Sequence, residues 1–290
     1  MSIIVSLTVP DAVILGVDST VSLPGLPKGA DIPLPANVIE WARGPAIKAY
    51  DGAEKLFALG NRPVGVAIYG TTMIGDRSIR SHLHEFVTKD PDGVLSRETS
   101  LQQIAEGLRA FFANLYEKVV KPFLQDFRKM PFDQIPVDQR PGFGFVIGGY
   151  SANAYLPEVF HVFVPTVSEP QVMRRQRELN ANWFGLYEPI DRYYKGYTQP
   201  ILNSLLEQFE KIHGSALSEQ NRADINALLA TYEYPNTISL MPVSVGIEYV
   251  RFLVGLVINH YRFDVGIPLV GGSVRIGKAT CASGTFEVLE

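Results

Sequence analysis

Ser2 is the residue whose type and position most directly suggest chemistry, because it follows the initiator Met1. Methionine aminopeptidases trim an initiator methionine when a small residue follows, and Ser2 would then carry a free α-amine. Its hydroxyl could act as a nucleophile, with its own amine as the base that accepts the proton. The alternative is an ordinary trimmed N-terminus without a catalytic role, so the elements around Ser2 must decide between the two interpretations.

Other familiar sets of catalytic or metal-binding residues do not occur. The sequence has no Gly-x-Ser-x-Gly elbow, no His-Glu-x-x-His helix and no kinase-like set of motifs. His82 and His84 lie two positions apart on a predicted helix, which places them on different faces and argues against a shared metal ion. The glycine-rich run 142–149 precedes neither a helix nor a Gly-Lys-Thr sequence, which argues against a phosphate-binding loop. We therefore expect neither a metal nor a cofactor.

Composition restricts the class of protein. The 290 residues are 46% hydrophobic and 19% charged, as in a globular protein that buries a substantial core. The net charge is −4 and the basic residues are scattered, which excludes an electrostatic surface for nucleic acid. No linker divides the chain, so we expect residues 1–290 to form a single domain with loop insertions near 24–45, 128–141 and 165–182.

The cysteine content and the N-terminus predict a cytoplasmic protein. Cys281 is the only cysteine, so no internal disulfide can form and a reducing compartment is favoured. The chain does not begin with a basic segment, an apolar core and a cleavage site, so no signal peptide is predicted. The apolar stretch 249–261 is interrupted by Arg251, Asn259 and His260 and is shorter than the roughly 20 residues that span a bilayer. We expect it to be a buried helix, and we expect no membrane partner.

The predicted elements group into strands and pairs of helices. Two apolar strands joined by a turn at 10–12 begin the chain, and the second ends at Asp18. Further strands are predicted over 55–59, 64–69, 142–150, 159–164, 182–185, 273–276 and 285–288. Helices are predicted from Thr71 or Thr72 through Phe86, from about Ser100 through Val120, from Ile190 toward Phe209, and from about Val243 to Arg262. This order lacks the alternation of strand and helix that a parallel sheet requires. An α+β fold with two stacked sheets between two helical layers, a four-layer αββα sandwich, satisfies it best.

Four segments of the sequence occur in the order that they take in proteasome β subunits. They are the strand that ends at Asp18, the Lys-Leu-Phe element at 55–57, the Val-Ala-Ile-Tyr-Gly-Thr junction at 66–71 and the Gly-Phe-Val-Ile-Gly-Gly-Tyr hairpin segment at 144–150. The chain therefore resembles the 20S proteasome and HslV family of N-terminal-nucleophile hydrolases, including its divergent bacterial homologues, over nearly its whole length. The strongest local match is 55–72, where the family has its active-site lysine and, one strand later, a substrate-binding Gly-Thr.

The resemblance implies five catalytic residues. Ser2 matches the nucleophilic threonine, Asp18 the aspartate that pairs with the lysine, and Lys55 the lysine that lowers the pKa of the nucleophile. Gly70 matches the glycine whose backbone N–H holds the oxyanion. Asp264 approximates the second aspartate, near the N-terminal amine.

The resemblance also implies that Ser19, Thr20 and Thr71 bind the substrate, which would be a peptide or protein. Without the family, Lys55 is interpreted as a strand-edge lysine with its ammonium group in solvent, and Asp18 as a residue that begins a turn. Both interpretations stay open at the level of sequence.

Departures from the family pattern support a second hypothesis. Serine replaces threonine at position 2, Gly185-Leu186-Tyr187 replaces the family's Gly-Ser-Gly, and Val265-Gly266-Ile267 after Asp264 breaks its Asp-x-x-Ser pattern. The first hypothesis is hydrolysis of peptide amide bonds by Ser2. The second is a catalytically silent protein of the same fold that acts through assembly, and an unrelated α+β domain is a third interpretation. Both proteasome-like hypotheses imply a homo-oligomeric ring or spiral built through helical faces, and the family implies an unfoldase partner.

Overall fold

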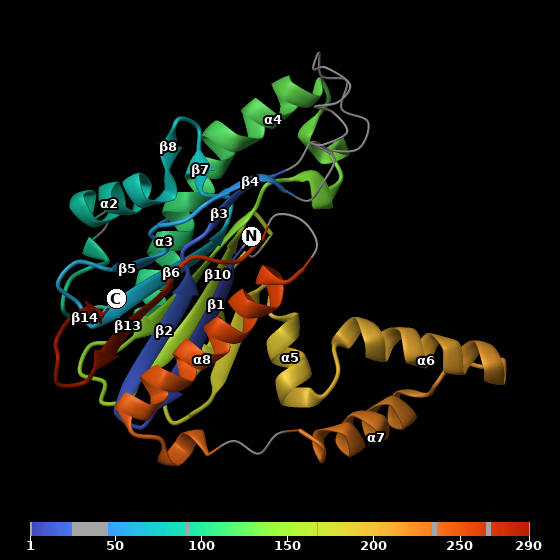
Figure 1. The fold of residues 1–290 in the computed structure, drawn as a ribbon. Helices are drawn as coiled ribbons and strands as arrows, with labels where there is room; N and C mark the ends of the chain where they lie inside the picture. The colour runs from blue at the N-terminus through green and yellow to red at the C-terminus, as the bar shows by residue number, and fades with distance from the viewer. Residues whose placement is uncertain are drawn as a thin grey trace.

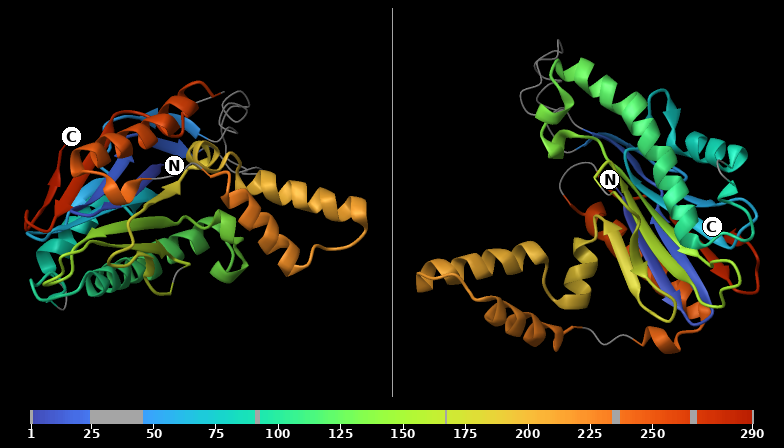
Figure 2. Two further views of the ribbon diagram at one scale, coloured as in Figure 1. Left: turned by 90° about the horizontal axis from the view of Figure 1, so that it is seen from below. Right: turned by 180° about the vertical axis from the view of Figure 1, so that it is seen from behind.

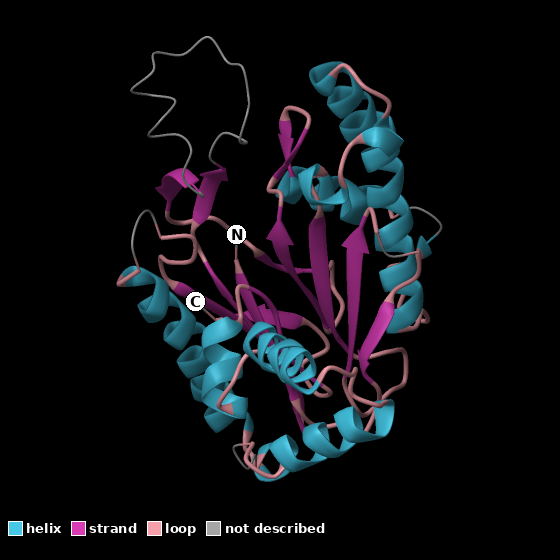
Figure 3. Cartoon of the chain, turned by 90° about the vertical axis from the view of Figure 1, so that its right-hand side faces the viewer, coloured by secondary structure: helices cyan, strands magenta, loops and turns pink. Residues whose placement is uncertain are grey.

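The computed structural model describes residues 2–24, 46–90, 93–166, 168–233, 237–264 and 268–289. At its centre two five-stranded antiparallel sheets stack face to face, and helices cover their outer surfaces (Figures 1 and 2). Figure 3 shows the same arrangement from the side, with the strands between the helices. These layers confirm the four-layer αββα sandwich predicted from the order of strands and helices.

The first sheet contains the N-terminal hairpin and has the order β12-β1-β2-β13-β14. Its strands are β12 (Ala181–Gly185), β1 (Ile3–Val9), β2 (Ala12–Asp18), β13 (Val274–Thr280) and β14 (Phe286–Val288). Every residue of β1 and β2 is buried, because one face of the sheet packs on helices and the other packs on the second sheet. This double burial explains their long apolar runs, since a strand with one face in water would alternate apolar and polar residues.

The second sheet has the order β11-β10-β9-β6-β5. Its strands are β11 (Gln171–Arg174), β10 (Glu158–Val164), β9 (Phe143–Gly149), β6 (Val64–Gly70) and β5 (Leu56–Ala58). Two separate hairpins consist of β3 (Val21–Pro24) with β4 (Ala46–Tyr50), and of β7 (Met73–Ile74) with β8 (Arg77–Ser78). Most of the insertion predicted near 24–45 lies outside the described residues, and the one near 165–182 contains β11.

The helices form two outer layers and a projecting arm. The second sheet is covered by α2 (Ile79–Lys89) and α3 (Leu101–Leu115), and α3 continues through the π-helical turn η2 (Tyr116–Val120) into α4 (Lys121–Arg128). The first sheet is covered by α5 (Glu188–Lys195) and α8 (Val243–Arg262). The helices α6 (Gln199–His213) and α7 (Glu219–Ala230) project from the sandwich, and we call them the α6–α7 arm (Figure 1). Short 3-10 turns are η3 (Phe132–Gln134) and η4 (Val137–Gln139), inside the insertion predicted at 128–141, and η5 (Ile238–Leu240).

An apolar core lies between each pair of adjacent layers. Phe112 of α3 packs on Phe145 of the second sheet, with 4.5 Å between ring centroids. Leu15 and Val146 belong to the core between the two sheets. Each large apolar side chain taken out of water stabilises the fold by about 1.5–3 kcal/mol.

Helix α8 packs tightly against the first sheet because glycine occupies position 16. A Cβ atom added at Gly16 would lie 2.3 Å from Val250 Cγ1, so a larger residue would push the helix away. By length and mean hydropathy, 1.3, α8 also has the composition of a membrane-spanning helix. However, Val250, Leu253, Val254 and Val257 are fully buried in the core beneath the first sheet. The helix predicted over 249–261 is thus confirmed, but only one of its faces is buried, since 28% of its apolar window lies inside the protein and Phe252 is 46% exposed.

Two predicted helices differ from the structure. The expected helix start at Thr71 or Thr72 is wrong, because 73–78 forms the β7–β8 hairpin, whose turn uses Gly75 at a φ of 63°. Ser78 caps α2 instead, and its side chain accepts a hydrogen bond from the Ser81 N–H. By contrast, the predicted helix start at Ser100 is confirmed and forms a complete capping box with Gln103.

The helix predicted from Ile190 toward Phe209 is interrupted. Gly196 takes a φ of 77° at the end of α5, a left-handed conformation that stops a helix, and α6 begins three residues later. The sequence did not predict α7 because this helix buries none of its residues and therefore lacks an apolar stripe directed at a core.

Candidate active site

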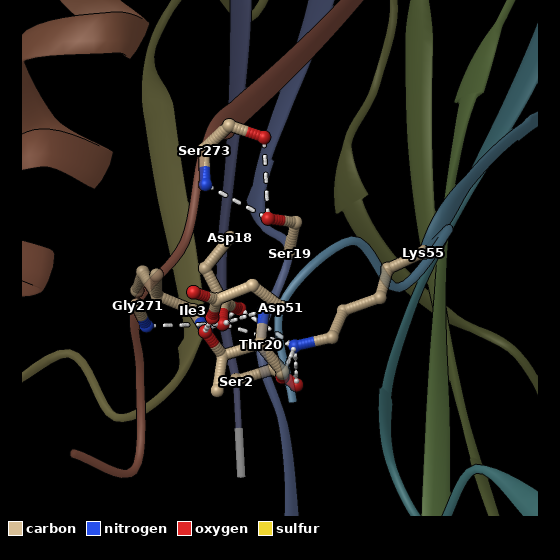
Figure 4. Close-up of polar contacts among 9 residues, drawn as sticks. All are labelled: Ser2, Ile3, Asp18, Ser19, Thr20, Asp51, Lys55, Gly271 and Ser273. Atoms are coloured by element: carbon tan, nitrogen blue, oxygen red, sulfur yellow. Dashed lines mark hydrogen bonds and ion pairs between the residues drawn. The ribbon is translucent and has the colours of Figure 1, made fainter. Parts of the chain in front are cut away.

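Ser2, Asp18 and Lys55, three of the five predicted catalytic residues, lie together in one cluster (Figure 4). Lys55 Nζ donates to Ser2 Oγ at 2.9 Å and to the two Asp18 carboxylate oxygens at 2.9 and 3.0 Å. It also donates to the carbonyl oxygen of Thr20. All four residues are at most 3% exposed. The structure therefore brings the predicted hydroxyl, carboxylate and amine into one buried cluster, while their catalytic roles stay predictions.

Both sheets contribute to the position of this cluster. Asp18 ends β2 and accepts the backbone N–H groups of Ile3 and Thr20, each at 3.1 Å, so the start of β1 is tied to the carboxylate. Lys55 immediately precedes β5 of the second sheet, and its carbonyl oxygen accepts the Ile68 N–H at 2.9 Å. The ion pair thus joins the two sheets next to Ser2.

Burial controls the charges of the cluster. Removal from water raises the pKa of Asp18, an effect that Lys55 and the backbone donors partly offset. Burial likewise lowers the pKa of Lys55, and the Asp18 carboxylate opposes that shift. Ser2, Asp18 and Thr20 offer oxygen acceptors to the three N–H donors of an ammonium group. A cationic donor aimed at a hydroxyl oxygen stabilises the deprotonated form, which is the form that attacks a carbonyl carbon.

Ser19 and Thr20, two of the predicted substrate-binding residues, are buried and bonded internally. Ser19 Oγ accepts the Ser273 N–H at 2.8 Å, and Thr20 Oγ1 donates to Asp51 Oδ1 at 2.6 Å. Their role in substrate binding stays a prediction. Sequence reasoning missed Asp51 and Ser273 as neighbours of the site, because their contacts depend on pairing between distant segments.

Gly70 and Thr71 lie at the end of β6. Gly70 has a φ of 92°, and a Cβ atom there would lie 2.4 Å from the Gly142 carbonyl oxygen, so only glycine fits. Thr71 donates its backbone N–H to the same oxygen at 3.0 Å. Thr71 also borders a pocket of about 490 Å³ with mainly apolar walls, including Phe143. Within the described residues no hydrogen bond joins Gly70 or Thr71 to Ser2, so their roles as oxyanion donor and substrate contact stay predictions.

A second pocket lies beside the backbone of Ser2. Its volume is about 480 Å³, and its walls include Gly185, the last residue of β12. The next residue, Leu186, donates its N–H to the Ser2 carbonyl oxygen at 2.9 Å. A Cβ atom at Gly185 would lie 2.0 Å from that oxygen, so the glycine allows this close pairing. The region where the family has Gly-Ser-Gly therefore holds the backbone of Ser2 without a serine side chain.

Three polar side chains in this pocket form a chain of hydrogen bonds that sequence reasoning did not predict. The Tyr69 hydroxyl lies 2.8 Å from His161 Nε2, and His161 Nδ1 lies 3.2 Å from Gln171 Oε1. Because an amide oxygen only accepts, Nδ1 carries the proton and Nε2 accepts from Tyr69. Burial raises the pKa of Tyr69 to about 12 and lowers the pKa of His161. The only sequence signal was the placement of His161 among aromatic neighbours.

Asp264 is separate from the buried cluster. It is exposed just after the end of α8, and no contact within the described residues joins it to Ser2. Residues 265–267, which break the family pattern, lie outside the described residues. The role of Asp264 near the N-terminal amine stays a prediction.

Comparisons with known proteins identify the fold. No family model and no curated protein matches the sequence. Among solved structures, a mutant Anbu from Hyphomicrobium sp. strain MC1 aligns over 100% of this chain and 85% of its own, with a TM-score of 0.50 and 9% identity. The chain has the fold of Anbu. Anbu (ancestral beta-subunit) from Yersinia bercovieri aligns over 96% of this chain and 81% of its own, with a TM-score of 0.44 and 11% identity. At such identity the likeness shows the fold alone, in agreement with the proteasome-like architecture.

Proposed function

We propose that this protein is a proteasome-like N-terminal-nucleophile hydrolase that cleaves peptide amide bonds with Ser2 after removal of Met1. The observation that carries the proposal is the 2.9 Å hydrogen bond from Lys55 Nζ to Ser2 Oγ, in a cluster completed by Asp18. Met1 lies outside the described residues, so its removal is part of the proposal.

Each group has a defined part in the proposed reaction. Ser2 Oγ attacks the carbonyl carbon of the substrate while its proton passes to the α-amine, directly or through a water molecule. Lys55 stabilises the negative charge that develops on Oγ, and Asp18 holds the ammonium group in place. The Gly70 N–H donates to the oxyanion of the tetrahedral intermediate. Collapse of that intermediate breaks the C–N bond, the leaving amine takes up the proton, and water then hydrolyses the ester and releases Ser2.

The substitution Ser2→Ala tests this proposal. It should lower peptide turnover by roughly a thousandfold or more, because no other nucleophile replaces the hydroxyl. Ser6→Ala is a matched control on β1, the strand that follows Ser2: Ser6 is buried, and its hydroxyl has no hydrogen-bond partner among the described residues. Ser6→Ala should retain activity. Normal turnover by Ser2→Ala would overturn the proposal.

A second candidate function, self-assembly into a ring or spiral, is favoured by the surface of the α6–α7 arm. Along α6, Ile201, Leu205, Phe209 and Ile212 are 43–79% exposed at the spacing of one helical face. On α7 no residue is buried, and Leu228 is 58% exposed. Such a continuous apolar face is typical of a surface covered in an assembly. Light scattering during size-exclusion chromatography tests this candidate, since a monomer at micromolar concentration would exclude it.

A further inference from the structure

A pocket of about 420 Å³ opens at the end of the sandwich opposite Ser2. The sheet pairings fix this location: β1 runs from Ser2 to the turn at Pro10, and Thr280 at the end of β13 pairs with Ala12 just beyond that turn. Cys281, the next residue, lines the pocket. The other walls come from the β5–β6 turn, the β9–β10 turn and the loop before α3. This pocket is therefore separate from the Ser2 cluster and from the two pockets near it.

The pocket is positively charged in an acidic protein. Its lining contains two arginines, Arg62 and Arg97, and no aspartate or glutamate, whereas the whole chain has a net charge of −4. The nearby Glu158 is held by the Ser151 hydroxyl, which donates to Glu158 Oε2 at 2.5 Å. Neither arginine forms an ion pair within the described part of the chain. The positive charge therefore has no carboxylate partner in the pocket.

Arg62 is fixed in position before any ligand binds. It is 4% exposed, and its guanidinium group donates to Thr99 Oγ1 at 3.1 Å and to the Thr99 carbonyl oxygen at 2.9 Å. Burial and, to a smaller extent, the positive charge of Arg97 lower the pKa of Arg62. Because Arg62 and Arg97 line one pocket, an anion placed between their guanidinium groups would offset the repulsion between the two positive charges. Arg97 is exposed and can move toward a ligand.

Another buried polar group lines the same pocket. Tyr150 is 2% exposed, and the Cys281 backbone N–H approaches its hydroxyl oxygen, but its O–H donates to no acceptor among the described residues. A buried O–H without an acceptor is uncommon in a folded protein. The pocket thus combines the fixed guanidinium of Arg62, the exposed guanidinium of Arg97 and a buried hydroxyl, that of Tyr150, with a proton to donate.

We propose that this pocket binds a small ligand through an anionic group with two or more oxygens, a carboxylate or a phosphate. The planar guanidinium fork matches two oxygens of either group, and such charge-assisted hydrogen bonds are among the strongest in proteins. The proposal does not depend on hydrolysis by Ser2.

Cys281 provides a local readout of binding, because it is exposed, lines the pocket and is the only cysteine of the chain. The probes are inorganic phosphate and acetate, titrated separately at constant ionic strength set with sodium chloride. Alkylation of Cys281 by iodoacetamide is followed by intact mass. We expect at least one probe to slow alkylation about threefold or more with a saturating dose response. If protection of Cys281 saturates with only one of the two probes, that probe identifies the ligand group as a phosphate or a carboxylate.

Arg97→Gln should raise the half-saturating probe concentration by roughly tenfold or more, because it removes a charge-assisted hydrogen bond. The control Arg80→Gln removes an exposed arginine of α2 that does not line the pocket and should bind as the wild type does. Arg62→Lys retains the charge but not the fork, and should weaken binding without the folding risk of a neutral substitution at a buried position. Absence of protection by both probes, equal slowing by sodium chloride, or unchanged binding by Arg97→Gln would overturn the proposal.

Discussion

The Ser2 cluster and the α6–α7 arm differ in whether their side chains find interaction partners within the chain. In the cluster, buried polar groups are paired within the chain, from the Lys55 ammonium to the Asp18 carboxylate and the backbone N–H groups that it accepts. In the arm, large apolar side chains such as Leu205 and Ile212 remain exposed to water. The cluster is therefore positioned by the fold alone, whereas the arm lacks a surface to cover it. Chemistry is expected from the first region and association from the second.

This comparison predicts that substitutions in the cluster cost stability and that substitutions in the arm do not. The largest effect is expected for Lys55→Met, because it leaves the Asp18 carboxylate buried without its cation. Loss of one partner of a buried pair costs about 3–5 kcal/mol. Urea unfolding measures the loss, and Lys278→Met is the control. Lys278 forms a partly exposed ion pair with Glu287, so its removal should cost at most about 1 kcal/mol.

The pH dependence of Lys55→Met gives a second check on the same variant. Burial raises the pKa of Asp18 in the folded protein, and loss of Lys55 removes the main opposing charge. A carboxyl group whose folded pKa is raised stabilises the fold most below its unfolded pKa of 3.8, and this contribution is lost as pH rises through the folded pKa. The stability deficit of Lys55→Met should therefore shrink as the pH is lowered toward 4. A deficit independent of pH would show that lost packing, rather than the unpaired carboxylate, causes it.

Coupling between the two charges should be the next largest effect. Asp18→Asn and Lys55→Met each break the pair, but together they remove both charges, so the double variant should lose about 1–3 kcal/mol less than the sum of the single losses. Additive losses in urea unfolding would mean that the 2.9 Å ion pair does not couple the two residues energetically.

A smaller effect on stability is expected from the ionisation of Tyr69, which is only partly buried. Burial raises its pKa from 10.0 to about 12, so the folded protein holds this proton more tightly than the unfolded chain does. The resulting stabilisation is complete below pH 10 and is lost as pH rises through about 12. In absorbance titrations of the native proteins, Tyr69→Phe should show one tyrosine fewer than the wild type ionising near pH 12. If the missing tyrosine titrates near pH 10, burial does not raise the pKa of Tyr69.

The smallest effect on stability, and a large one on assembly, is expected for Leu205→Glu. Leu205 is 63% exposed, so a charge there should change the free energy of unfolding of the monomer by no more than about 0.5 kcal/mol. In an assembly that covers this face, the same charge would be buried and the complex would dissociate. Gln208→Glu adds an equal charge at another exposed position of α6 and serves as the control. Equal masses for Leu205→Glu and the wild type in mass photometry would exclude the arm as the contact surface.

The sequence predicted those features that depend on local pattern. The layers follow from the apolar runs of β1 and β2 and from the helical spacing of α3. The grouping of Ser2, Asp18 and Lys55 was implied by the resemblance to the proteasome and HslV family. Asp51 and Ser273 were missed because the partner of each lies in a segment distant along the chain. The β7–β8 hairpin and the break between α5 and α6 were missed because each depends on a single glycine, Gly75 or Gly196, that takes a positive φ.

The most direct test of the account is the intact mass of the purified native protein, before and after reaction with a peptide epoxyketone. This reagent requires both the hydroxyl and the free amine of an N-terminal nucleophile. If Ser2 is the nucleophile, the chain lacks Met1 and gains one epoxyketone, with the adduct on Ser2 and none formed by Ser2→Ala. Retention of Met1 together with the absence of an adduct would contradict the proposed hydrolase and leave assembly as the function of this fold.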